Sequence, residues 1–216
     1  MNGSSTRIAG TELQLFPERI VWWPARRIVF AADVHVGKEA TFRRHGVPLP
    51  EGGLEERLAR LTRCVDALDA DRLIILGDFI HAPVGLTRSV VQTVTTWSAT
   101  LSASTIVVEG NHDRQVGGFP DGWQVDLRTS PLNIGPFSLQ HDPEGTADGY
   151  VLAGHLHPTV DLRDGGDRLR LPCFRFDDDV GVLPAFTSFS NGIRQHPRQG
   201  RRLLAVTEDA VIRLDW

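Results

Sequence analysis

Five short segments hold most of the side chains in this chain that can bind a metal ion. They are Asp33-Val34-His35, Gly77-Asp78, Gly110-Asn111-His112-Asp113, His141 and Gly154-His155-Leu156-His157. Four of them directly follow apolar runs typical of β-strands (IVFAA, LIIL, TIVVE and YVLA), and the fifth ends the mixed run PFSLQ. Because an open α/β sheet binds its ligands outside the carboxyl ends of its strands, these side chains can converge on one crevice. Oxygen and imidazole donors without sulfur favour divalent metals such as manganese, iron or zinc.

The bulk composition sets the class of protein. A chain of 216 residues, 41% hydrophobic and 23% charged, predicts a single globular domain over residues 1–216. No stretch reaches the length of a membrane-spanning helix, and the first ten residues lack the apolar core of a signal peptide. Cys64 and Cys173 lie far apart, so we expect buried free thiols and a cytoplasmic location. The net charge of -4 argues against non-specific coating of DNA, yet it permits a local basic track.

The order of the predicted elements is typical of a sheet with helices on its faces. A hairpin is predicted around Pro17-Glu18, and two apolar stripes at helical spacing (Leu54 to Leu68 and Leu86 to Leu101) alternate with three buried strands. This β-α-β-α-β order predicts a largely parallel sheet. After Gly122 the pattern changes to short strands with turns, which include the turn at residues 164–167 and a closing hairpin over residues 203–214.

The spacing within the first two polar segments favours a shared metal site. Asp33 and His35 are one residue apart, so their side chains share a face if the strand continues through them. Taken alone, they could be a turn acid and a surface histidine. The next strand, however, ends at Gly77-Asp78, where glycine leaves room and the two oxygens of Asp78 can bridge two cations.

The later segments follow the same logic. Gly, Asn and Asp at residues 110–113 are turn formers, and a plain turn is the alternative interpretation of that tetrapeptide. A histidine within the turn, opposite the other polar strand ends, argues against that alternative. His155 and His157 are again one residue apart and predicted to share a face. His141 stands alone and could simply be a polar strand end.

The five segments, in this order over residues 33–157, resemble the motif set of the calcineurin-like metallophosphoesterases. Segments outside them are similar to the bacterial ligase-associated DNA-damage-response endonucleases of that superfamily. These further segments are His35-Val36-Gly37-Lys38, Thr41-Phe42-Arg43, Gly46 to Pro50, Arg170 to Phe174 and Leu183 to Phe186. Thr187 and Asn191 depart from the endonuclease pattern, which has glycine in this segment.

The resemblance implies a four-layer α-β-β-α sandwich of two packed sheets and two divalent metal ions. It implies manganese as the preferred metal, with iron, zinc or nickel as alternatives. The first ion is then held by Asp33, His35, Asp78 and His157, and the second by Asp78, Asn111, His141 and His155. By the same resemblance His112 faces the substrate and Asp113 orients it by hydrogen bonding. Such a pair can protonate a leaving alkoxide.

Further residues are candidates for substrate binding. Lys38 and Arg43 follow the first metal segment closely enough to contact a phosphate, although an exposed helix would also carry them. His81 lies three residues past Asp78, a spacing similar to that of the double-strand-break repair nucleases of the superfamily, although a surface loop would also carry it. The runs Arg43-Arg44 and Arg194 to Arg202 could contact phosphates, or they could be solvated loops.

These observations predict a phosphodiesterase that uses a metal-activated hydroxide. The endonuclease resemblance implies DNA as the substrate, a role in repair, and functional association with an ATP-dependent DNA ligase and a helicase. A phosphodiesterase or phosphatase acting on nucleotides or cyclic nucleotides is the alternative, because the metal segments fit it equally. A non-catalytic scaffold would lack a ligand or an acid, and none is missing from the sequence.

Overall fold

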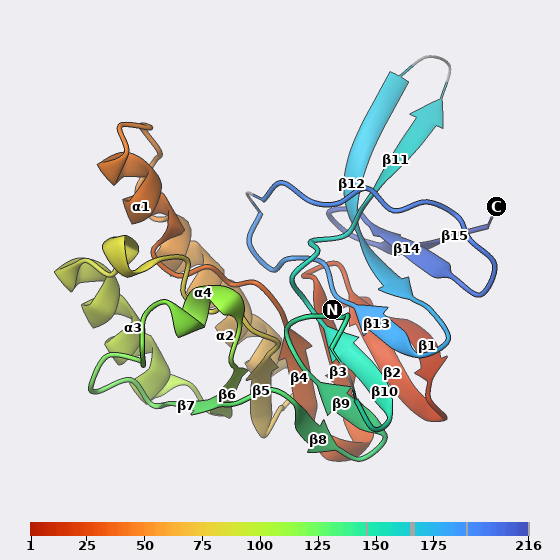
Figure 1. Cartoon of the computed structure of the whole chain (residues 1–216), viewed down its shortest axis with the longest axis horizontal. Coiled ribbons are helices and arrows are strands. Elements are labelled where there is room, and N and C mark those ends of the chain that lie inside the picture. Colours follow the sequence, from red (N-terminus) through yellow and green to blue (C-terminus); the bar gives the residue numbers. More distant parts are fainter. Residues whose placement is uncertain (146, 165–166, 189, 216) are drawn as a thin grey trace.

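Two mixed β-sheets pack face to face in the computed structural model, which describes residues 1–145, 147–164, 167–188 and 190–215 (Figure 1). The first sheet has the strand order β1-β2-β3-β4-β5-β6-β7. Its strands are β1 (Ser4–Ile8), β2 (Thr11–Phe16), β3 (Ile20–Trp23), β4 (Ile28–Ala31), β5 (Arg72–Ile75), β6 (Ser104–Val108) and β7 (Val125–Arg128). Strands β4 to β7 pair in parallel, and β1 to β4 pair antiparallel.

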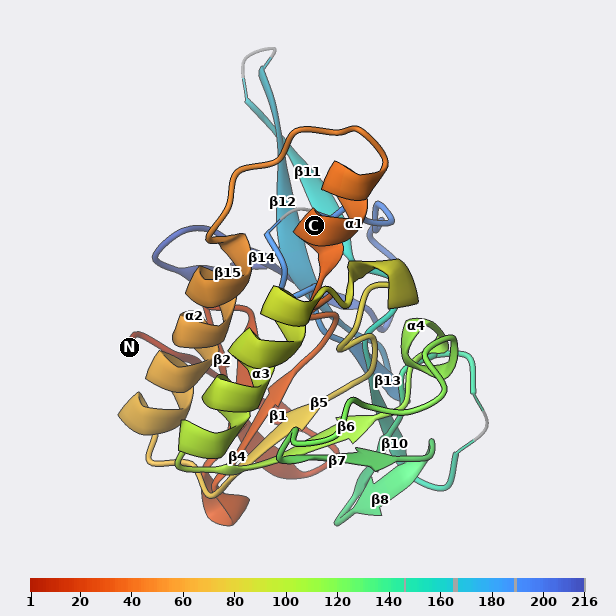
Figure 2. The same ribbon diagram turned by 90° about the vertical axis from the view of Figure 1, so that its left-hand side faces the viewer.

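Helices cover the outer face of this first sheet. The two long helices, α2 (Gly53–Ala67) and α3 (Arg88–Thr100), connect its parallel strands and lie side by side (Figure 2). Their apolar stripes pack on Val29, Ala31 and the other outward-facing residues of the sheet. Short helices follow two of the strands that carry candidate ligands: α1 (Lys38–Arg44) comes after β4, and α4 (Asn111–Arg114) after β6. Pro24–Arg26 and Pro83–Gly85 form single 3₁₀ turns, η1 and η2.

The second sheet has the order β15-β14-β12-β13-β10-β9-β8, and β11 pairs with β12 beside it. Its strands are β8 (Leu132–Ile134), β9 (Phe137–Leu139), β10 (Tyr150–Ala153), β11 (Thr159–Asp164), β12 (Asp167–Phe176), β13 (Val180–Val182), β14 (Arg202–Val206) and β15 (Val211–Leu214). Strands β11 and β12 form a long antiparallel hairpin that extends beyond both sheets (Figure 1).

The main core lies between the two sheets. Phe30 and Ile74 of the first sheet meet Leu152, Phe174 and other inward-facing residues of the second. Residues of β4 alternate between this core and the helix-side core, so all four of them are buried. This double burial explains the continuous apolar runs of the central strands. It also fixes the register of those strands, since a shift of one residue would exchange their two faces.

Most of the predicted elements are confirmed, and two expectations need correction. The two-sheet sandwich, both hairpins and the two amphipathic helices are present. The first sheet is mixed rather than largely parallel, because β1 to β3 extend it antiparallel. In the described part of the chain no helix follows residue 114, so the expected helical layer does not cover the second sheet. A small cluster of Val160, Cys173, Leu203 and Ala205 forms there, as β11 crosses that face.

Two further expectations concern the state of the two cysteines and the turn at residues 164–167. Both cysteines are buried free thiols in separate clusters, as predicted, and burial raises the pKa of each to about 12. The antiparallel pairing of β11 with β12 agrees with the predicted turn, whose residues 165 and 166 lie outside the described chain. Among the described residues no helix is both long and apolar enough to cross a membrane.

Phe30 tests the core between the sheets. Its side chain is fully buried and its ring stacks on Trp23 with a centroid distance of 6.4 Å. We expect Phe30→Ala to lower the free energy of unfolding by about 3–5 kcal/mol, because a large cavity remains. Leu169→Ala is the control, since that side chain is 57% exposed, and it should change stability by less than about 0.5 kcal/mol. Urea denaturation measures both, and equal shifts would contradict a shared core around Phe30.

Candidate metal centre

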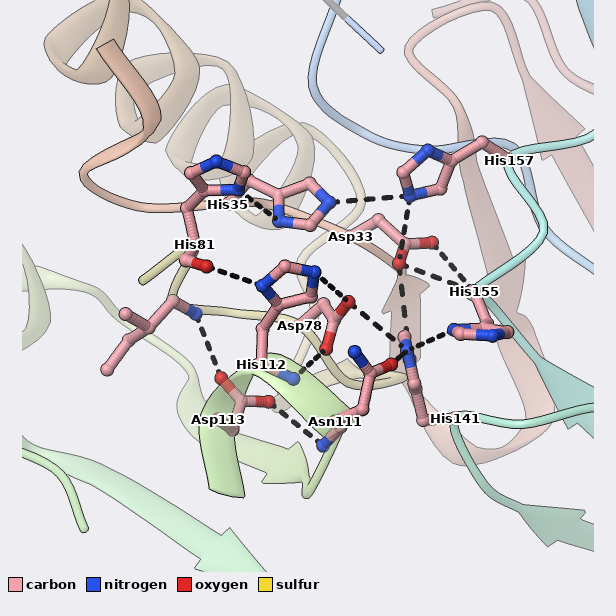
Figure 3. Close-up of polar contacts among 12 residues, drawn as sticks. Asp33, His35, Asp78, His81, Asn111, His112, Asp113, His141, His155 and His157 are labelled. Atoms are coloured by element: carbon pink, nitrogen blue, oxygen red, sulfur yellow. Dashed lines mark hydrogen bonds and ion pairs between the residues drawn. The ribbon is translucent and has the colours of Figure 1, made fainter. Parts of the chain in front are cut away.

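The five polar segments meet at one end of the two sheets. They follow the carboxyl ends of β4, β5 and β6 in the first sheet and of β9 and β10 in the second. All seven candidate metal ligands, together with His81, His112 and Asp113, gather in one place (Figure 3). The predicted convergence of strand ends is therefore what the structure shows.

Backbone hydrogen bonds hold neighbouring segments together beyond the strands. The amides of Asp33 and His35 donate to the carbonyls of Gly77 and Asp78 at 3.2 and 3.0 Å. In the second sheet the amide of Gly154 donates to the carbonyl of His141 at 3.2 Å. Each loop thus continues the pairing of its parent strand, and the positions of the side chains follow from sheet register.

The backbone at the ligands differs from the extended chain that the sequence predicted. Asp33, His35, Asp78, His155 and His157 all adopt the left-handed conformation, with φ between 44° and 69°. This conformation is uncommon for residues other than glycine, and such strain clusters at functional sites. The pairs Asp33/His35 and His155/His157 do converge as predicted, but they do so through tight left-handed turns and not through strand alternation.

One group of donors consists of Asp33, His35 and His157. The Nε2 atoms of His35 and His157 lie 3.3 Å apart, and Nε2 of His157 lies 3.3 Å from Oδ1 of Asp33. Asp33 is fully buried, and its carboxylate also accepts the amide of His155 at 3.1 Å. Three ligand atoms from the loops after β4 and β10 could therefore bind one cation.

The second group consists of Asp78, His141 and His155, with Asn111 beside it. Nε2 of His141 lies 3.2 Å from Oδ2 of Asp78, 3.0 Å from Nδ1 of His155 and 3.1 Å from Oδ1 of Asn111. On the other side of the ring, Nδ1 of His141 donates to the carbonyl of Leu76 at 2.9 Å. That bond leaves Nε2 as the ring atom that could bind a metal, and the contacts of Nε2 place His141 within the group.

Glycines create the space in which these side chains meet. A Cβ atom on Gly77 would lie 2.3 Å from Nδ1 of His141, and one on Gly110 would lie 2.3 Å from Oδ1 of Asp78. A Cβ atom on Gly154 would lie 2.7 Å from Oδ2 of Asp33. Each glycine before a ligand segment therefore prevents a clash inside the site.

The electrostatics of this cluster favour positive charge. Burial opposes protonation of His141, but its hydrogen bond to Asp78 and the charge of Asp33 raise its pKa to about 9. Burial would likewise raise the pKa of Asp78, but the bond from His141 holds it below its usual range. Burial lowers the pKa of His35, whose ring is then neutral, as a metal ligand must be. Two buried carboxylates among imidazole nitrogens fit a pair of divalent cations.

The site is open on one side. Asp33, His35, Asp78 and His141 are at most 3% exposed, whereas His155 is exposed at the rim. The side chain of His112 is 31% exposed. A substrate must therefore approach past the exposed histidines.

His112 lies beside the donors, as the sequence predicted, but its hydrogen-bond partners differ from the expectation. Its Nδ1 donates to the backbone carbonyl of His81 at 2.5 Å, and its Nε2 lies 3.8 Å from Oδ2 of Asp78. Among the described residues, Asp113 makes no hydrogen bond to the His112 ring. Its carboxylate accepts the amides of Ile80 at 2.9 Å and Gly110 at 3.0 Å, while burial raises its pKa to about 6. Asp113 thus positions His112 through the backbone.

His81 belongs to the site. Its ring stacks on His112 at 5.3 Å and on Phe42 at 6.0 Å between centroids, and its Nδ1 lies 3.4 Å from Nδ1 of His35. Phe42 was not a predicted site residue, although it lies in one of the segments that carry the endonuclease resemblance. An aromatic residue at the fifth position of α1 gave no separate signal in the sequence.

Lys38 and Arg43 take different positions on α1. Lys38 is 7% exposed, and burial together with the charge of Arg57 lowers its pKa to about 8. Its charge lies close enough to His35 and His81 to lower their pKa values. Arg43 is exposed and donates to the carbonyls of Leu49 and Pro50 at 3.4 and 3.3 Å. Lys38 therefore lies next to the site, whereas Arg43 stabilises the loop after α1 by hydrogen bonds to its backbone.

Comparison with known proteins identifies the family. Residues 26–183 match the family model described as calcineurin-like phosphoesterase. The chain belongs to the calcineurin-like phosphoesterase family. This membership confirms the superfamily resemblance and makes the chain a metal-dependent phosphoesterase. Among curated proteins no relative matches the chain.

Two solved structures are similar to this phosphoesterase. The Pseudomonas putida nuclease MPE has 36% sequence identity and a TM-score of 0.86, over 99% of this chain and 100% of that chain. Yfce, a phosphoesterase from E. coli, has 17% identity and a TM-score of 0.39, over 86% of this chain and 96% of that chain. The second likeness is too distant to support an argument.

Gly77 tests the close packing of the metal centre. We expect Gly77→Ala to bind fewer than two equivalents of divalent metal, because the new methyl group must displace His141. Gly46→Ala is the matched control: its φ of 80° is close to the 76° of Gly77, yet nothing lies within 4 Å of its added Cβ. Elemental analysis of the dialysed proteins measures metal content, and circular dichroism checks folding. Equal metal content in both variants would contradict the arrangement.

Proposed function

We propose that this calcineurin-like phosphoesterase is a two-metal phosphodiesterase that cuts DNA, as an endonuclease in DNA repair. The observation that carries the proposal is the similarity to the Pseudomonas putida nuclease, which extends over 99% of this chain. A nuclease likeness over the whole chain favours a polymeric substrate above a free nucleotide. The metal donors alone would fit either substrate.

We propose Asp33, His35 and His157 as ligands of one cation and His141, His155 and Asn111 as ligands of the other. Asp78 lies among these donors and would contribute to both (Figure 3). When bound, two such ions lower the pKa of a shared water and neutralise charge on the phosphate. Manganese is the metal we propose, since carboxylate donors suit it, with iron, zinc and nickel as alternatives that imidazole donors also suit.

His112 is proposed to protonate the leaving oxygen. Its Nδ1 is occupied by the His81 carbonyl, so Nε2 is the atom that can exchange a proton with a substrate. That nitrogen lies on the side of Asp78, and the side chain is partly exposed. The bonds from Ile80 and Gly110 to Asp113 fix the two backbone segments that hold His112 in this position.

Lys38 is proposed to contact the phosphate of the substrate. Lys38 is buried, its charge lies close enough to His35 and His81 to lower their pKa values, and its own pKa of about 8 leaves it mostly protonated at neutral pH. A buried cation there would attract a diester anion at short range. His81 would help to orient the metal ligand His35 through the contact between their Nδ1 atoms.

The cellular setting remains part of the proposal. Two buried free thiols agree with a reducing compartment, and we propose a cytoplasmic location. The resemblance of the sequence to ligase-associated endonucleases adds functional association with an ATP-dependent DNA ligase and a helicase.

A substrate panel tests the proposed function. We expect the manganese-loaded protein to cleave single-stranded, nicked or circular DNA and also bis-p-nitrophenyl phosphate, with little release of phosphate from p-nitrophenyl phosphate. Cleavage of circular DNA separates endonuclease from exonuclease action. Hydrolysis of cyclic nucleotides without any cleavage of DNA would overturn the proposal in favour of a small-molecule diesterase.

His112 tests the division between binding and chemistry. We expect His112→Ala to retain both metals and to lose about 10²–10⁴-fold in the rate of DNA cleavage. The loss should be smaller for bis-p-nitrophenyl phosphate, because p-nitrophenolate leaves readily without a proton. Comparison of kcat on the two substrates, together with metal analysis, measures the effect. Equal losses on both substrates, or the loss of a metal, would show that His112 has another role.

A further inference from the structure

An arginine cluster on the β11–β12 hairpin is not used by the site described above. The carboxylate of Asp161 on β11 accepts from Arg168 and Arg170 of β12 and from Arg194, at 2.5, 3.0 and 2.9 Å. We call these four residues the arm cluster. The Asp161 side chain is completely covered, whereas the three arginine side chains are 48%, 51% and 40% exposed.

The arm cluster carries more positive charge than its own structure needs. One carboxylate can be neutralised by one guanidinium, yet three surround it, so two net positive charges remain. The hydrogen bond from Arg168 lowers the pKa of Asp161 to about 2, so its charge is constant at neutral pH. The three arginine side chains are 40–51% exposed, so part of each remains accessible to a ligand in solution while it holds Asp161.

The other basic residues of the C-terminal region are used differently. The side chain of Arg201 is 11% exposed and holds Asp177, and Arg202 donates to Thr6 and lies over the ring of Phe176. The run from Arg194 to Arg202, which the sequence suggested as one phosphate-binding track, is therefore divided. Arg201 and Arg202 join elements of the fold, and Arg194 alone joins the arm cluster.

The arm cluster is connected directly to the metal centre. Thr159 at the base of β11 lies two residues after His157 and pairs with Arg194. The carbonyl of Asn191 lies 3.4 Å from Nδ1 of His157, and the amide of Ile193 donates to Leu156 at 3.1 Å. Asp161 lies four positions after His157, so extended chain separates their Cα atoms by about 13 Å at most. The β11–β12 hairpin and α1 both extend from the end of the sheets where the site lies (Figures 1 and 2).

We propose that Arg168, Arg170 and Arg194 bind the phosphodiester backbone of the DNA strand whose scissile phosphate lies at the metal centre. The inference rests on the proposed function, because it names the surface that a polymeric substrate would use. A reach of about 13 Å corresponds to about four nucleotides at 3.4 Å each. Guanidinium groups with free N–H donors are suited to phosphate oxygens. A small diester bound at the metal centre would be too short to contact the arm cluster as well.

The first test replaces all three arginines. DNA affinity is measured by fluorescence anisotropy of a labelled 20-nucleotide strand and of its duplex, in a metal-loaded His112→Gln background where cleavage is slow. We expect the Arg168→Gln, Arg170→Gln, Arg194→Gln variant to flatten the log–log salt dependence by about 2 for the single strand or about 2.7 for the duplex. The form of DNA, single-stranded or duplex, that loses more affinity is the form that the arm cluster binds.

The control is an Arg63→Gln, Arg128→Gln, Arg213→Gln variant with the same change in net charge. These arginines are about as exposed or more so, and each pairs with a single exposed carboxylate elsewhere on the fold. We expect the salt dependence of DNA binding by this control variant to equal that of the protein with the arm cluster intact. In a background with His112 intact, both triple variants should hydrolyse bis-p-nitrophenyl phosphate at the rate of the parent protein.

Asp161→Asn separates recognition of DNA from a structural role. This substitution weakens the ion pairs of the arm but raises its net charge from two to three. If the cluster binds phosphate, we expect DNA affinity to rise and the salt dependence to steepen. If the cluster only stabilises the hairpin, Asp161→Asn should lower the melting temperature. DNA affinity should then fall as well, as it would in the triple arginine variant.

The outcomes separate this inference from the proposed function. Equal DNA affinity and salt dependence in the arm and control variants, or weaker binding by Asp161→Asn, would overturn the role of the arm while DNA cleavage by the parent protein continued. Failure of the parent protein both to bind and to cut DNA would overturn the arm and the proposed function together. Loss of DNA cleavage with retained diester hydrolysis in the arm variant alone supports the inference.

Discussion

The structure depends on bringing two buried carboxylates, Asp33 and Asp78, into one cluster of imidazoles. Buried anions are costly unless they are paired and hydrogen-bonded. Each carboxylate accepts a backbone amide, from His155 and His112 respectively, and the raised pKa of His141 shows that the remaining field attracts a positive charge. The two-metal chemistry proposed here follows from that requirement, since divalent cations satisfy it more completely than a proton does.

The sandwich supplies the rigidity that this cluster needs. The central strands are buried on both faces, so their register is fixed, and backbone hydrogen bonds extend that register into the loops that carry Asp33 and Asp78. Left-handed turns at five candidate ligands then direct the side chains inward. Such turns persist only where the surrounding structure compensates for their strain. Glycines at positions 77, 110 and 154 remove the atoms that would otherwise occupy the centre.

Charge is distributed unevenly around the site, which makes an acidic chain compatible with the DNA substrate proposed above. The net charge of -4 describes the whole surface, whereas the arm cluster concentrates positive charge within reach of the metal centre. Lys38 adds a buried cation near His35 and His81, on α1. A local arrangement of this kind can guide a strand without binding DNA indiscriminately.

The sequence by itself determined the central strands, the two amphipathic helices and the convergence of the polar strand ends, because these depend on short-range periodicity and on the direction of parallel strands. Its spacing from Asp78 made His81 a candidate beside the alternative of a surface loop, and the tertiary structure shows its ring stacked on His112. Only the tertiary structure decided the partner of Asp113, the separate roles of Arg194 and Arg201, and the contact of Phe42 with His81. Each of these joins segments distant in the chain, and local sequence carries no record of which side chains meet across a fold. The left-handed turns at the ligands were equally hidden, because Asp and His adopt them here only under the constraint of neighbouring loops.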